Sequence, residues 1–78
     1  MRSEEFNNLD YRYKTETVLQ ADFLADRFTE TAYVRLYNLD STYIEVFFDN
    51  RSHLIIHFRA FEHTLFLMPY LEDISLDI

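Results

Sequence analysis

Three side chains with charge or acid–base chemistry, Arg35, Glu45 and His57, fall at odd-numbered positions of three segments in which apolar and polar residues alternate. A guanidinium, a carboxylate and an imidazole in one row, flanked by aromatic rings, can bind an anion or form the polar centre of a protein interface. They can equally form ordinary cross-strand charge pairs on a solvated face, each contributing about 0.2–1 kcal/mol. No nucleophile belongs to the row, so we expect binding rather than catalysis.

The composition excludes several kinds of active site. The chain contains no glycine and no cysteine. Phosphate-binding loops, dinucleotide fingerprints and the Gly-x-Ser-x-Gly elbow all need glycine, and thiolate zinc sites and disulfides need cysteine. The carboxylate pairs Glu4–Glu5 and Glu72–Asp73 resemble solvated ends of elements, and so small a domain offers little depth for a cleft between two carboxylates. We therefore predict a protein that is not an enzyme and holds no cofactor.

The histidines do not predict a metal site. His53 and His57 are four residues apart on one strand, about 13 Å at strand rise, which is too far to share a zinc ion. His57 could join Glu62 and His63 only through a fold-back of the chain that the sequence does not demand.

The elements that position these residues are read from strict alternation between Ala32 and Phe61. Three segments (32–37, 43–48 and 54–60) carry apolar residues at even positions and mixed residues at odd positions. This period of two is typical of antiparallel strands with one buried face. The connectors Leu39–Ser41 and Asn50–Ser52 are short and polar enough for hairpins.

The alternation also predicts a register. Antiparallel neighbours bring their apolar residues together only if the paired numbers sum to an even value, so we place Leu36 opposite Ile44 and Val46 opposite Ile56. Every even side chain from 32 to 60 then points inward. The odd side chains form the candidate interaction surface in three rows: Arg35–Glu45–His57, Tyr37–Tyr43–Arg59 and Tyr33–Phe47–Ile55.

The flanking segments predict what covers the apolar face. Residues 4–21 favour a helix with a loose apolar stripe of Phe6, Leu9 and Tyr13, which Leu19 can extend. For Asp22–Phe28 we favour a fourth strand that turns at Thr29–Thr31, and a single helix running to Arg27 is the alternative. Residues 65–73 predict a short helical turn around Pro69.

Together these elements predict one α+β domain over residues 1–78, in two layers. An antiparallel β-meander of three to four strands packs on an N-terminal helix and is followed by a short C-terminal helical turn. The end of the chain, Pro69–Ile78, alternates acidic and apolar residues. It closes the core or, alternatively, serves as a short docking motif.

Charge limits the partners. The formal net charge is −7, with one lysine and six dispersed arginines. Nucleic acid and anionic membranes should repel such a chain, whereas a basic protein surface should attract it. No apolar run is long enough for a membrane span or a signal peptide, so we expect a cytoplasmic protein.

The fourteen Phe and Tyr residues exceed what the core of so small a domain can enclose. Our leading hypothesis is a non-enzymatic interaction domain that forms a homodimer through the aromatic odd-numbered face. A scatter of half-buried tyrosines is the plain alternative for these rings. The second functional hypothesis is an acidic inhibitor or decoy that binds a basic protein, and the third is a ligand cavity between helix and sheet.

Overall fold

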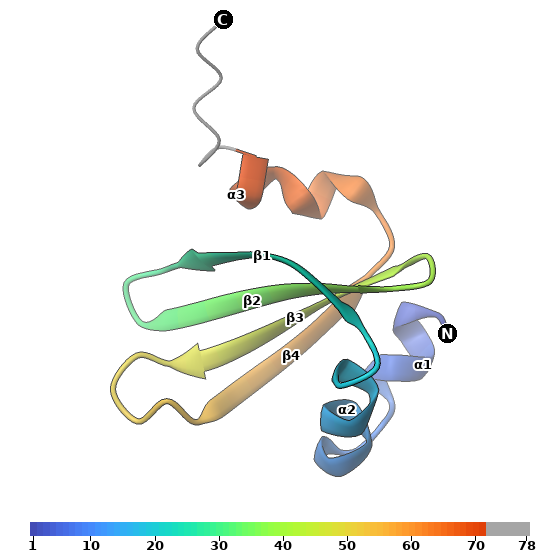
Figure 1. Cartoon of the computed structure of the whole chain (residues 1–78), viewed down its shortest axis with the longest axis horizontal. Helices are drawn as coiled ribbons and strands as arrows, with labels where there is room; N and C mark the ends of the chain where they lie inside the picture. The colour runs from blue at the N-terminus through green and yellow to red at the C-terminus, as the bar shows by residue number, and fades with distance from the viewer. Residues whose placement is uncertain (72–78) are drawn as a thin grey trace, which may run out of the picture.

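The computed structural model describes residues 1–71, and the structural statements below refer to that part of the chain. Four strands form one antiparallel sheet in sequential order: β1 (Asp22–Phe28), β2 (Ala32–Leu39), β3 (Thr42–Asp49) and β4 (Ile55–Phe61) (Figure 1). The α+β meander is confirmed, and so is the fourth strand from Asp22 to Phe28. The pair Glu72–Asp73 and most of the alternating C-terminal segment lie outside the described residues.

The N-terminal helical region consists of two short helices, α1 (Ser3–Asn7) and α2 (Tyr11–Val18), where we predicted one helix. Asp10 explains the break. Its side chain accepts a hydrogen bond of 3.0 Å from the backbone N–H of Tyr13, which makes Asp10 the N-cap of α2. An aspartate stabilises a helix start better than a helix interior, so the chain restarts there.

The predicted register between β2 and β3 is wrong by one residue. The hairpin loop is only Asp40–Ser41, with Leu39 opposite Thr42, so paired numbers sum to an odd value. Leu36 therefore lies opposite Glu45 rather than Ile44. Asp40 makes the tight loop feasible by adopting a left-handed backbone with φ of 54°. A shift of one residue moves every side chain of the partner strand to the other face.

The register between β3 and β4 differs from the prediction by two residues, because Val46 lies opposite Phe58 instead of Ile56. The turn is longer than three residues, and the Asp49 side chain accepts hydrogen bonds from the backbone N–H groups of Arg51 and Ser52. An irregularity beside Phe47 and Phe48 then moves the pairing again. Glu45 consequently lies opposite Arg59, not His57.

These registers place apolar residues on both faces of the sheet, so the prediction of two layers with all even side chains inward is wrong. On the face that we call the α2 face, Phe6 of α1 packs with Ile44, Val46 and Phe58. On the opposite face, the α3 face, Tyr70 packs with Leu36 and Phe61. Tyr70 belongs to α3 (Met68–Leu71), which follows the 3-10 helix η1 (Thr64–Leu67). Figure 1 shows α1 and α2 on one side of the sheet and α3 on the other, which confirms the C-terminal helical turn.

Candidate functional site

The nine residues of the predicted interaction surface are divided between the two faces, so the three predicted rows do not form. Strand pairing places five of them on the α3 face: Tyr43, Glu45, Phe47, His57 and Arg59. The other four, Tyr33, Arg35, Tyr37 and Ile55, lie on the α2 face.

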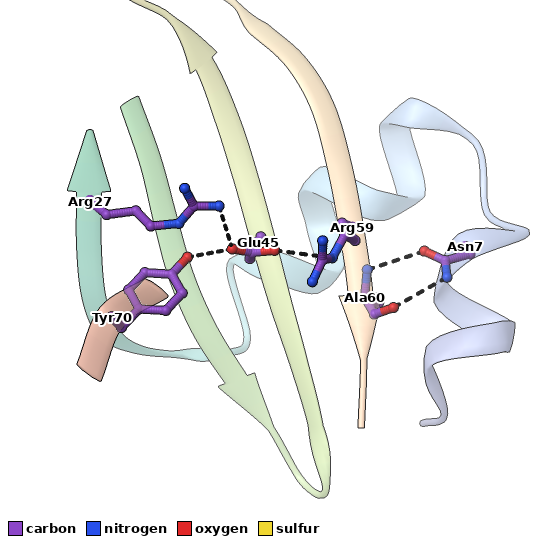
Figure 2. A network of polar contacts seen from close by, with 6 residues as sticks. All are labelled: Asn7, Arg27, Glu45, Arg59, Ala60 and Tyr70. Atoms are coloured by element: carbon purple, nitrogen blue, oxygen red, sulfur yellow. Dashed lines mark hydrogen bonds and ion pairs between the residues drawn. The ribbon is translucent and has the colours of Figure 1, made fainter. Parts of the chain in front are cut away.

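On the α3 face, the fully buried carboxylate of Glu45 is the centre of a polar network. Its Oε2 accepts hydrogen bonds from the Tyr70 hydroxyl over 2.6 Å and from Nη2 of Arg27 over 3.2 Å. Its Oε1 lies 3.2 Å from Nε of Arg59. Figure 2 shows Arg27 of β1 and Tyr70 of α3 reaching Glu45 from one side and Arg59 of β4 reaching it from the other. The carboxylate thus joins three strands and α3.

The network shifts the pKa values of two of its members, Tyr70 and Arg27. Burial, together with the hydrogen bond to Glu45, raises the pKa of Tyr70 well above its usual value, so the phenol stays neutral. Burial lowers the pKa of Arg27, but hydrogen bonds with Tyr70 and Glu45 outweigh burial and raise the pKa overall. None of these three residues lines the described cavities. The network therefore anchors α3 to the sheet.

Each arginine within the sheet lies between two aromatic rings. The guanidinium carbon of Arg27 is 5.8 Å from the ring centre of Phe47 and 5.4 Å from that of Tyr70. For Arg59 the two rings are Phe61 at 5.1 Å and Phe66 at 4.7 Å. For Arg35, on the other face, they are Phe23 at 4.6 Å and Tyr37 at 5.4 Å. Stacking of this kind keeps the cations in place and covers the rings.

The two most exposed aromatic residues of the strands, Phe23 and Phe28, lie on the α2 face. The helices cover only part of it, and the side chains of Leu19, Phe23 and Phe28 are 85%, 47% and 74% exposed. The rings of Phe28 and Tyr33 lie 4.9 Å apart, and Phe48 follows 5.9 Å from Tyr33. We call the following set the aromatic face: Leu19, Phe23, Phe28, Tyr33, Tyr37, Phe48 and Ile55.

A groove of about 210 Å³ runs along the aromatic face between α2 and the sheet. Its walls are almost entirely apolar and include Val18, Leu19, Tyr37 and Phe48. An apolar recess beside a protruding leucine is suited to contact with another apolar surface rather than to a polar reaction.

Each edge of the sheet is interrupted at one point. At β4, the side-chain amide of Asn7 accepts from the N–H of Ala60 over 3.2 Å and donates to its carbonyl over 3.4 Å, as a neighbouring strand would (Figure 2). At β1, the pairing shifts between Phe23 and Ala25, which leaves Leu24 as an extra residue. Capping groups and bulges are two ways in which proteins prevent edge-to-edge pairing.

Sequence reasoning missed several residues that matter at these sites. Arg27 and Tyr70 were assigned to elements but not to a site, because their partner Glu45 is 18 and 25 residues away. Asn7 contacts an edge strand 53 residues distant, and no local pattern signals such a contact. On the α2 face of β1, Asp26 lies between Phe23 and Phe28, because Leu24 is an extra residue in the pairing. No local sequence pattern signals this extra residue.

Three observations complete the description of residues 1–71. No three His, Asp or Glu side chains there are placed to hold a metal ion. No helix in that range has the length and apolar character needed to cross a membrane. As for relatives, no protein-family model, curated protein or solved structure matches the chain, so its function has to be argued from the site alone.

Proposed function

We propose that this chain is a non-enzymatic interaction domain that self-associates through the aromatic face. The observation that carries the proposal is the exposure of Leu19, Phe23 and Phe28 on one side of the sheet, next to an apolar groove. Scattered single apolar residues are common on protein surfaces, but rings in mutual contact beside a groove are typical of binding faces.

The size of the aromatic face supports a dimer. Large apolar side chains present about 150–250 Å² each when free, so the exposed parts of this face amount to roughly 500 Å². Protein interfaces are about 56–58% apolar, which implies roughly 900 Å² of total contact on each copy. Stable complexes bury about 800 Å² on each partner, so a contact of this size is large enough for a dimer, and its affinity depends on how well the contact is packed.

The shape of the face favours a second copy as the occupant. It combines a protruding side chain, Leu19, with a recess whose volume accommodates an aliphatic side chain. A twofold axis places the protrusion of each copy against the recess of the other, which gives a closed, self-complementary contact. The blunted edges at Ala60 and Leu24 favour this face over extension of the sheet.

Sedimentation velocity across roughly 1–500 μM tests the proposal. We expect a monomer–dimer equilibrium that shifts at least about tenfold towards monomer in Leu19→Glu, because a carboxylate would be buried in the apolar contact. Leu65→Glu is the matched control. It introduces the same charge at an exposed leucine of η1, 62% exposed, and should leave the equilibrium unchanged. A wild-type chain that stays monomeric over the whole range, or two variants with equal effects, would overturn the proposal.

A further inference from the structure

One aromatic pair of the sheet, Phe28 with Tyr33, repeats the surroundings of the internal arginines but has no cation of its own. Arg27 and Arg59 each combine two rings with the carboxylate of Glu45. Phe28 and Tyr33 lie beside a carboxylate as well, that of Asp26. Within residues 1–71, no lysine or arginine stacks on these two rings or lies within ion-pair distance of Asp26.

These residues line a hollow of about 400 Å³ at one end of the sheet, together with Asn50 and His53. The turns β1–β2 and β3–β4 meet at this end. Asn50 ties them together, because its backbone N–H donates to the carbonyl of Thr31 over 3.2 Å and its side chain reaches the carbonyls of Thr29 and Glu30. The walls of the hollow are therefore held in place before any ligand arrives.

Asp26 is oriented by one hydrogen bond and keeps its other oxygen available. Its Oδ2 accepts from the Tyr33 hydroxyl over 2.8 Å, and the described residues provide no donor to Oδ1. Burial and this hydrogen bond raise the pKa of Tyr33, although the charge of Arg35 opposes the shift. Arg35, directly across the strands from Asp26, stacks on Phe23 and Tyr37 instead.

We propose that this hollow binds a guanidinium group, either the side chain of an arginine in another protein or a small guanidinium compound. The ring of Phe28, 74% exposed, offers the stacking surface and Asp26 the negative charge, which is the combination that Arg27 and Arg59 use inside this protein. A net charge of −7 attracts such a cation from solution. The hollow shares Phe28 and Tyr33 with the aromatic face, so the proposed dimer would compete with the guanidinium for these two rings. The apolar groove beside α2, in contrast, is lined by none of the residues of the hollow.

To test this, the ¹⁵N-labelled chain is titrated with methylguanidinium and, separately, with a capped Gly-Arg-Gly peptide. Binding is measured from the changes in the backbone amide chemical shifts. Shallow, solvated sites of this kind bind weakly, so we expect dissociation constants of about 1–10 mM, with the shifts concentrated at Asp26, Phe28, Tyr33, Asn50 and His53. A capped Gly-Lys-Gly peptide should bind at least about threefold more weakly, because an ammonium cannot stack as a plane. Peptide binding at least fivefold tighter than methylguanidinium identifies a protein side chain as the ligand, and equal binding identifies the small compound.

Matched variants distinguish binding at this specific site from nonspecific electrostatic attraction to the acidic chain. Asp26→Asn should weaken guanidinium binding at least about fivefold, and Phe28→Ala should weaken it by a similar factor. Asp22→Asn removes the same charge from another exposed position of β1 and should leave the constant unchanged. Equal weakening by Asp22→Asn and Asp26→Asn, or shifts spread over the whole surface, would overturn the inference. Each titration is also made in Leu19→Glu, in which the proposed dimer is weakened and Phe28 and Tyr33 are uncovered. Absence of guanidinium binding in this monomeric variant would overturn the inference whatever the fate of the dimer.

Discussion

The hydroxyl of Tyr70 and the carboxylate of Glu45, 25 residues apart in the chain, are joined by a hydrogen bond of 2.6 Å. Tyr70 is the buried residue of α3, and Glu45 lies at the centre of β3. The carboxylate is out of contact with water, so its charge is tolerated only because Tyr70, Arg27 and Arg59 surround it. The stability of the α3 face therefore depends on keeping all members of this network together.

Replacing the carboxylate of Glu45 should strongly destabilise the folded chain. In Glu45→Gln, Arg27 is left partly buried without its counter-charge, and we expect the free energy of unfolding to fall by about 3–5 kcal/mol. Urea unfolding followed by circular dichroism measures the change. Glu45→Met leaves the same two arginines, Arg27 and Arg59, without a counter-charge and also removes the side-chain oxygen that accepts from Tyr70 and Arg27, so it should be no more stable than Glu45→Gln.

The hydroxyl of Tyr70 alone should contribute less to the free energy of unfolding than the carboxylate of Glu45. Tyr70→Phe keeps the ring and removes one hydrogen bond to a charged acceptor, so we expect a loss of about 1.5–3 kcal/mol. Tyr13→Phe removes a hydroxyl from an exposed tyrosine of α2 and should change stability by less than about 0.5 kcal/mol. Equal stability of the two variants would show that the Tyr70–Glu45 hydrogen bond does not hold α3.

The same hydrogen bond predicts how stability depends on alkaline pH. The pKa of Tyr70 is raised in the folded chain above its usual value of 10.0, so above pH 10.0 the unfolded chain loses this proton while the folded chain keeps it. The contribution is therefore complete below pH 10.0 and declines above it, by up to about 1.4 kcal/mol per pH unit. Urea unfolding between pH 8 and pH 11.5 should show the stability difference between wild type and Tyr70→Phe shrinking above pH 10.0. A difference that stays constant would mean that Tyr70 titrates normally.

Asn7 should protect the β4 edge. Asn7→Ala removes two hydrogen bonds to Ala60, so we expect unfolding to become easier by about 1–2 kcal/mol and the Ala60 amide to exchange faster with solvent. The exposed edge should also promote concentration-dependent aggregation, measurable by light scattering. Asn7→Asp is an informative control. The aspartate keeps an oxygen that accepts from the Ala60 N–H, but its second oxygen cannot donate to the Ala60 carbonyl and repels it. Its exchange rate should fall between those of wild type and Asn7→Ala.

The sequence was sufficient to predict the strands but not how they pair. Alternation of residue types identified β2, β3 and β4, and it favoured a strand at β1, because period two is a local property of each segment. The register depends on the number of loop residues. Two loop residues at Asp40–Ser41, in place of the three that we assumed, move Arg35 and Glu45 to opposite faces.

Mixed residue types then made the wrong register look plausible. On the α3 face, Tyr43 packs against the cluster that contains Tyr70, and Phe47 lies beside Arg27 and His57. On the α2 face, Arg35 and Tyr37 are amphipathic enough to remain half-exposed. Because both faces of the sheet are partly covered, neither the odd-numbered nor the even-numbered residues of a strand are purely polar. The alternation therefore does not indicate which face is buried. The residues of the interaction surface were therefore recognised individually, but their grouping required coordinates.

The hairpin that sets this register should become more stable if its strained residue is replaced. Asp40 has a φ of 54°, a conformation that costs a non-glycine residue energy and that glycine adopts freely. Asp40→Gly should therefore raise the free energy of unfolding by up to about 1 kcal/mol, measured by urea unfolding, although glycine also gains freedom in the unfolded chain. Asp40→Val is the opposing variant, because a β-branched residue disfavours positive φ most strongly, and it should lower stability by more than 1 kcal/mol. If Asp40→Val were as stable as Asp40→Gly, the two-residue loop would not be the feature that places Leu36 opposite Glu45.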